Sequence, residues 1–142
     1  MHTINLKASK DSKEYNFKFN IHRCEGFEDL SLSAQDFYKE HGKKELVFPH
    51  YEVEVLGHES LPAGTHCFKS GDGRGFICWP FRTPTKSDAV KLATGWSAAA
   101  FMTIETGEDA NTVLGKFCSQ EKQLRHLENA AESIGVNIEI LT

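Results

Sequence analysis

The sequence predicts an α+β domain in which a mostly antiparallel sheet packs against two or three C-terminal helices. Period-two alternation of polar and apolar residues is confined to the first 81 residues and to the last six. Residues 85–135 instead carry apolar residues at helical spacing, and no alternating strand–helix pattern is present. This order of elements, with strands first, then helices and then one terminal strand, is typical of a sheet built from N-terminal hairpins plus a C-terminal strand.

The chain has 142 residues and shows no linker, repeat or low-complexity segment, which predicts a single domain over residues 1–142. Two alternating runs flank residues 9–12 and predict the first hairpin; their apolar members are Ile4, Leu6 and Ala8, then Tyr15, Phe17, Phe19 and Ile21. A short helix is predicted over 33–41, capped by Ser33 with Asp36 and stopped by Gly42. A strand is predicted over 46–56, with Glu52 and Glu54 facing water.

A second hairpin is predicted from 64–70 and 75–81. Asp72-Gly73 is a preferred type I′ turn, and that turn would pair residues whose numbers sum to 145. Cys67 would then face Cys78, and one face would be core-like, with His66, Phe68, Ile77, Trp79 and Phe81.

The second half of the chain predicts helices and one strand. Cap candidates at 85–88 precede a long helix that runs to about Ile104 and has a broad apolar face. Further helical spacing follows, first through Val113, Leu114 and Phe117, and then from Leu124 to Ile134, where Gly135 is the expected stop. A last strand is expected over 136–141.

Charge is unevenly distributed along the chain. Sixteen Lys and Arg against twenty Asp and Glu give a net charge of −4, which disfavours duplex nucleic acid as a partner. Residues 1–63 carry −3 and residues 98–142 carry −4, whereas residues 64–97 carry five bases and two acids, or +3. The positive segment includes the junction between the second hairpin and the long helix.

This junction predicts an anion site. Unpaired N–H groups and the helix dipole at a helix N-terminus favour phosphate or carboxylate. Basic, hydroxyl and aromatic side chains could complete the site, and the expected ligand contacts are Arg74, Trp79, Phe81, Arg82, Thr83, Thr85, Lys86, Ser87 and Trp96. The competing interpretation is ordinary: a helix cap, core aromatic residues and solvated charges.

Metal and catalytic motifs are weak, so no metal ligand, cofactor or catalytic residue is assigned. His50, His58 and His66 recur every eight residues, but C-x2-C and H-E-x-x-H spacings are missing. The pairs Cys24 with His22 and Cys118 with His126 are candidates for a Cys/His dyad only if the fold brings each pair together.

The leading hypothesis is therefore a small non-enzymatic binding protein for an anionic, nucleotide-like ligand. One alternative is a protein–protein inhibitor or adaptor, for example a phage or mobile-element counter-defence protein, acting through its acidic helices; the other is a Cys/His-dependent enzyme. The acids in question are Glu105, Glu108, Asp109, Glu121, Glu128 and Glu132. The broad helix face and open strand edges predict a homo-oligomer, most simply a dimer. The chain has neither a signal-peptide pattern nor a membrane-length apolar run, which predicts a cytoplasmic protein.

Overall fold

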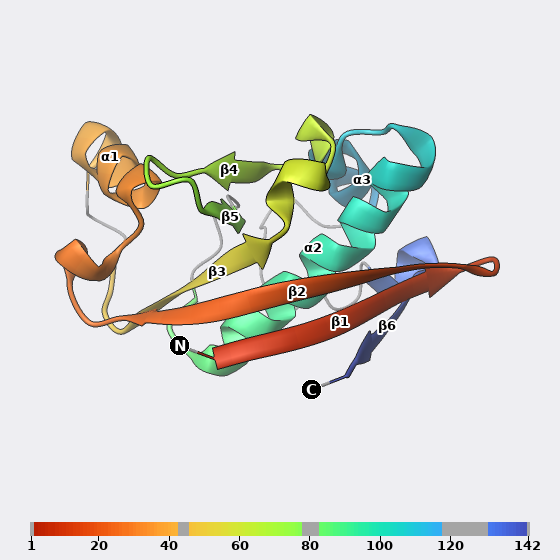
Figure 1. Cartoon of the computed structure of the whole chain (residues 1–142), viewed down its shortest axis with the longest axis horizontal. Helices are drawn as coiled ribbons and strands as arrows, with labels where there is room; N and C mark the ends of the chain where they lie inside the picture. Colours follow the sequence, from red (N-terminus) through yellow and green to blue (C-terminus); the bar gives the residue numbers. More distant parts are fainter. Residues whose placement is uncertain (1, 43–45, 78–82, 118–130, 142) are drawn as a thin grey trace.

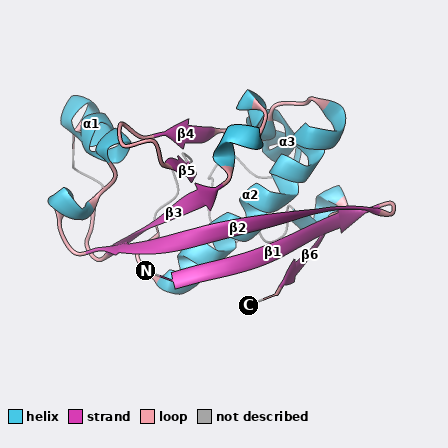
Figure 2. Ribbon diagram, in the orientation of Figure 1, coloured by secondary structure: helices cyan, strands magenta, loops and turns pink. Residues whose placement is uncertain are grey.

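A computed structural model describes residues 2–42, 46–77, 83–117 and 131–141. Their strands form one six-stranded sheet in the order β4-β5-β3-β2-β1-β6, and every neighbouring pair is antiparallel (Figures 1 and 2). Helix α2 (Lys86–Thr106) crosses one face of this sheet behind β1, β2 and β3. The α+β class with N-terminal hairpins and a C-terminal strand is confirmed.

The first hairpin consists of β1 (His2–Lys10) and β2 (Lys13–Cys24). Lys10 pairs with Lys13, and the two residues between them both have positive φ, 52° at Asp11 and 69° at Ser12. That conformation defines a type I′ turn, whose twist matches that of the two strands. The hairpin is as predicted, although its strands are longer than the alternating runs.

Helix α1 (Leu32–His41) begins one residue earlier than predicted, and its N-cap is Ser31. The Ser31 hydroxyl accepts a hydrogen bond from the backbone N–H of Ala34 at 3.2 Å. The predicted cap at Ser33 is therefore wrong, because Ser33 already lies inside the first turn. No residue of α1 is buried, so polar contacts at its first turn hold it in place.

Strand β3 (His50–Leu56) pairs with β2 and begins after Pro49 rather than at residue 46. Val53 and Val55 are buried toward α2. The expectation that Glu52 and Glu54 face water is wrong, because Glu54 is only 8% exposed and Glu52 is partly buried.

Strands β4 (Cys67–Lys69) and β5 (Gly75–Ile77) form the second hairpin in a register different from the predicted one. Cys67 pairs with Ile77 rather than Cys78, so paired numbers sum to 144. The loop has three residues: Ser70 N–H bonds to Arg74 C=O, Gly73 N–H bonds to Ser70 C=O, and only Gly73 has a positive φ, 89°. A type I turn followed by a left-handed glycine accounts for the one-residue shift. The predicted core-like face is therefore wrong, because the slip of one residue places Phe68 opposite Phe76, and Ile77 no longer shares a face with Phe68.

Where it is described, the helical half matches the sequence pattern; residues 118–130, which include most of the helix predicted from Leu124 to Ile134, lie outside the described residues. Helix α2 has Thr85 as its N-cap and Gly107 as its C-cap, and α3 (Ala110–Phe117) follows it. Residues 131–134 are helical and stop at Gly135, which has a φ of 84°. Strand β6 (Asn137–Ile140) then pairs with β1 at the sheet edge.

The core lies between α2 and the sheet. Trp96 is 0% exposed and makes edge-to-face contacts with Phe17 and Phe19, at centroid distances of 5.3 and 5.6 Å. Ala98, Ala99 and Ala100 are all fully buried. The broad apolar surface of α2 is thus largely covered within the chain itself.

Candidate functional site

The N-terminus of α2 carries a capping box that fixes where the predicted anion site could lie. Thr85 Oγ1 accepts from the N–H of Asp88 at 3.1 Å and donates to Asp88 Oδ2 at 2.7 Å. The same carboxylate accepts from Thr85 N–H at 3.2 Å. Asp88 therefore supplies one negative charge to this helix end, where it interacts favourably with the dipole.

The cap leaves two backbone donors open. Among the described residues no acceptor meets the N–H groups of Lys86 and Ser87, and the side chains of both are exposed. The Lys86 ammonium has no acidic partner in the described part of the chain. Two N–H groups, one hydroxyl and one ammonium thus lie together at the start of a 21-residue helix.

Thr83 positions this helix end rather than offering a free hydroxyl. It is 2% exposed, its Oγ1 donates to the C=O of Tyr51, and its own C=O accepts from Tyr51 N–H at 2.9 Å. These two bonds hold the segment that precedes α2 against the start of β3. Thr83 can therefore orient the site, but its hydroxyl is already satisfied.

Trp96, which the sequence suggested as a stacking surface, is a core residue. Its ring is inaccessible to solvent, and its Nε1–H donates to the C=O of Thr65 at 2.8 Å. A ligand outside the core has no face of this ring to contact, so we remove Trp96 from the candidate contacts.

Arg74 lies on the opposite face of the sheet from α2. Phe76 pairs directly with Glu54 and so shares the face that points away from α2, and the Arg74 guanidinium lies over the Phe76 ring at 5.2 Å. Arg74 also forms an ion pair with Asp72 at 2.6 Å, and this contact lowers the pKa of Asp72. Arg74 is therefore separated from the α2 end of the predicted site. The remaining predicted contacts, Trp79, Phe81 and Arg82, lie outside the described residues.

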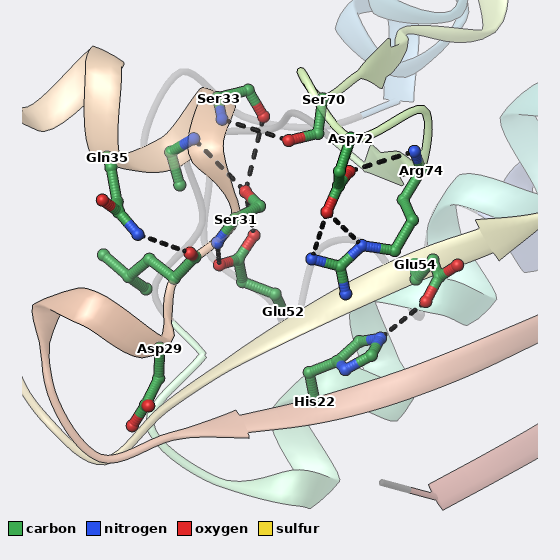
Figure 3. Close-up of polar contacts among 12 residues, drawn as sticks. His22, Asp29, Ser31, Ser33, Gln35, Glu52, Glu54, Ser70, Asp72 and Arg74 are labelled. Atoms are coloured by element: carbon green, nitrogen blue, oxygen red, sulfur yellow. Dashed lines mark hydrogen bonds and ion pairs between the residues drawn. The ribbon is translucent and has the colours of Figure 1, made fainter.

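The face of the sheet opposite α2 carries a polar cluster that the sequence did not predict. We call it the outer-face cluster, and it consists of His22, Glu52, Glu54, Asp72 and Arg74 (Figure 3). His22 Nε2 contacts Glu54 Oε1 at 2.6 Å, and the His22 ring lies 5.8 Å from the Phe76 ring. The carboxylates of Asp72, Glu54 and Glu52 all raise the pKa of Arg74, with Asp72 contributing most. Three carboxylates around one guanidinium make this cluster unfavourable for anions.

Glu52 connects the outer-face cluster to α1. Its Oε1 accepts from Ser31 N–H and its Oε2 accepts from Ser31 Oγ, both at 2.7 Å. Cys24, 1% exposed, lies 3.9 Å from Glu52 Oε1. Burial, followed by the carboxylates of Glu52 and Asp29, raises the pKa of Cys24 to about 12. Near neutral pH Cys24 is therefore a protonated thiol and a poor nucleophile, which weakens the Cys/His enzyme hypothesis at this position.

The outer-face cluster depends on strand register. His22 pairs with Glu52, yet its imidazole reaches diagonally to Glu54. Alternation alone places Glu52 and Glu54 on one face, and likewise His22 and Cys24. Alternation does not show which of the two sheet faces another part of the chain will cover. Neither the Ser-x-Ser sequence at the start of α1 nor the Gly-rich hairpin loop indicates that it will fold over these carboxylates.

The histidines at eight-residue intervals do not converge. His66 bonds to Asp109 at 2.8 Å, whereas His50 is at the start of β3 and burial lowers its pKa. The His58 ring lies against Gly75, where an added Cβ would come within 2.4 Å of its Cγ. In the described residues no group of three or more His, Cys, Asp or Glu side chains could hold a metal ion. Cys118 and His126 fall outside the described ranges.

Two of the acids assigned to a partner-binding surface are used within the chain. Glu105 accepts from Tyr15 Oη at 2.6 Å and pairs with Lys13 at 3.2 Å, and Asp109 bonds to His66. Glu132 is exposed, while Glu121 and Glu128 lie outside the described residues. The acidic surface is thus less available than the sequence suggested.

Comparison of the chain with protein-family models, curated proteins and solved structures gives no match. Within the described ranges, no helix is long and apolar enough to cross a membrane.

Proposed function

We propose that this protein is a small binding protein that captures an anionic, nucleotide-like ligand at the N-terminus of α2. The observation that carries the proposal is the pair of open backbone donors at Lys86 and Ser87, beside the exposed Lys86 ammonium. An anion at this position would accept both N–H groups and benefit from the helix dipole.

The charge of the surrounding segment supports an anion rather than a cation. Residues 64–97 carry +3 inside a chain of net charge −4. Both acids of that segment have internal partners, since Asp72 pairs with Arg74 and Asp88 caps the helix. In this proposal Arg82 adds a second cation, and Trp79 or Phe81 stacks on a ring of the ligand.

Three of the residues predicted to contact the ligand do not contact it in this proposal. Thr83 and Thr85 orient the helix end through their own hydrogen bonds. Arg74 is left out, because it lies among carboxylates on the other face. A cytoplasmic setting, where nucleotides are abundant and thiols stay reduced, fits Cys24 as a free thiol.

The inhibitor or adaptor hypothesis has less support, because Glu105 and Asp109 are occupied by contacts within the chain. The enzyme hypothesis is also weaker, because Cys24 is a protonated thiol near neutral pH. Of the three hypotheses, ligand binding is the one that uses the backbone N–H groups of Lys86 and Ser87, which have no acceptor among the described residues.

Thermal-shift screening with nucleotides and sugar phosphates tests the proposal, since a specific ligand raises the melting temperature by mass action. For any compound that binds, calorimetry then compares the wild type with the double variant Arg82→Ala, Lys86→Ala. Loss of two charge-assisted contacts should weaken binding by about 100-fold.

Lys18→Ala is the matched control, because Lys18 is an exposed lysine of β2 on the face opposite α2. It removes one positive charge and should leave affinity within about twofold. Equal affinity of wild type and double variant for every compound that binds would overturn the assignment, as would a panel in which no anion raises the melting temperature.

A further inference from the structure

One edge of strand β6 is paired with no other strand that the structure describes. The N–H of Leu141 donates to the C=O of Asn5 at 2.8 Å, and Ile140 pairs with Leu6 in the same register. Hydrogen-bonding pairs alternate along an antiparallel ladder, so residues 137, 139 and 141 direct their backbone groups toward β1. The N–H and C=O groups of Ile138 and Ile140 therefore point away from β1, and β6 is the last strand in the sheet that the structure describes.

The edge is also apolar and accessible. Ile140 is 53% exposed and Leu141 is 46% exposed, two of the exposed large hydrophobic residues of the described chain. Ile138 and Ile140 share a face with their partners Ala8 and Leu6, which are both fully buried. The isoleucines thus extend the core face of the sheet to its open border.

No lysine or proline protects this edge. Glu139 is the only charged residue of β6, and Lys7 of the neighbouring strand pairs with it at 3.2 Å. Proteins usually guard open edges with lysine or proline. The opposite edge follows that rule, because β4 ends in the exposed Lys69.

From these observations we infer that β6 pairs antiparallel with β6 of a second copy, so that one sheet continues across a two-fold dimer. A second copy is the occupant because an antiparallel pair related by a two-fold axis needs only a strand complementary to itself. The same strand supplies the outward N–H and C=O groups and the apolar side chains. This inference is independent of the proposed ligand site, which is at the N-terminus of α2.

The charge of Glu139 restricts the register. Outward backbone groups at 138 and 140 allow pairing centred on Ile138, Glu139 or Ile140. Centring on Glu139 would place the two Glu139 side chains directly opposite each other, which is destabilising. The dimer is therefore centred on Ile138 or on Ile140.

Sedimentation equilibrium over a wide concentration range tests the dimer. The wild type should shift from the 15.9 kDa mass of the single chain to twice that mass as concentration rises. Ile140→Lys, a change at an exposed position that adds an edge-protecting charge, should remain at the monomer mass throughout. Val47→Lys makes the same kind of change at a residue that is 51% exposed and lies outside the strands, and should dimerise like the wild type.

Hydrogen exchange gives a second readout that does not depend on a variant. In the dimer the amides of Ile138 and Ile140 should become protected as concentration rises, while the Leu141 amide, already bonded to Asn5, should change little. A wild type that stays monomeric at every concentration would overturn the inference. So would an Ile140→Lys variant that dimerises like the wild type, or a dimer in which the Ile138 and Ile140 amides exchange as fast as in the monomer.

Discussion

The hydroxyl group of Ser31 links the first helix to the sheet. Ser31 Oγ accepts from the N–H of Ala34 and donates to Glu52 Oε2, so it caps α1 and anchors it to β3 at the same time. Because α1 buries none of its own residues, apolar packing contributes little to its position. The stability of α1 therefore rests on a few polar atoms.

Ser31→Ala should lower the free energy of unfolding by about 2 kcal/mol, because it removes both a helix cap and a hydrogen bond to a carboxylate. Urea unfolding followed by circular dichroism measures the loss. Ser33→Ala is the control, since within the described ranges Ser33 Oγ has only a 3.4 Å contact with Ser31 Oγ, and it should cost well under half as much. Equal losses in the two variants would mean that Ser31 has no special role.

At the scale of single elements, the β4–β5 hairpin shows how one glycine determines a register. Gly73 closes the three-residue loop with a φ of 89°, and nothing lies within 4 Å of where its Cβ would be. Space is therefore available for a side chain, and only the backbone conformation opposes one. The loop also brings Asp72 and Arg74 to the outer-face cluster.

Gly73→Ala should destabilise the protein by about 1–2 kcal/mol, the cost of a left-handed conformation for a residue with a Cβ. Gly73→Asn should cost less, because asparagine tolerates that conformation better. Thermal or urea unfolding of the two variants separates the values. An alanine variant as stable as the wild type would contradict the assigned turn.

Across the whole molecule, carboxylates join elements that are far apart in the sequence. Glu105 of α2 contacts Tyr15 and Lys13 of the first hairpin, and Asp109 before α3 contacts His66 before β4. The hydrogen bond from Tyr15 lowers the pKa of Glu105, and the hydrogen bond from His66 lowers the pKa of Asp109. A carboxyl whose pKa is lower in the folded chain stabilises the fold above its unfolded pKa and stops doing so as acid protonates it.

The free energy of unfolding should therefore fall as pH drops below about 4, where unfolded carboxyls begin to take up protons. Urea unfolding at several pH values between 6 and 3 measures this slope. Asp109→Asn removes one of the linked groups and should give a shallower slope than the wild type. A variant with an unchanged slope would show that the His66 contact does not contribute.

The sequence predicted the fold class and most elements because a strand or helix with one buried face repeats its apolar residues at a fixed period. Phe17, Phe19 and Val53 lie at the alternating positions expected of strands that pack on α2. Thr85 and Asp88 mark the start of that helix. Register, by contrast, depended on a turn choice that the Asp-Gly pair left ambiguous. The outer-face cluster was missed because no local pattern shows that Ser31 and Arg74 will lie over Glu52 and Glu54.

The candidate site was predictable only in part. The open donors of Lys86 and Ser87 follow from a helix start, which local sequence shows well. The sequence misplaces Trp96 and Arg74, because closeness along the chain does not determine closeness in space. Trp96 points into the core, and Arg74 lies across the sheet from α2.

The burial of Trp96 gives the protein an internal reference for fluorescence measurements. The protein has two tryptophans, and the Trp96 indole is packed between aromatic rings with its N–H bonded to Thr65. Its emission should be blue-shifted and resistant to quenching by iodide, since no quencher in solution can reach the ring. Any emission that iodide does quench is then assigned by elimination to the other tryptophan, Trp79.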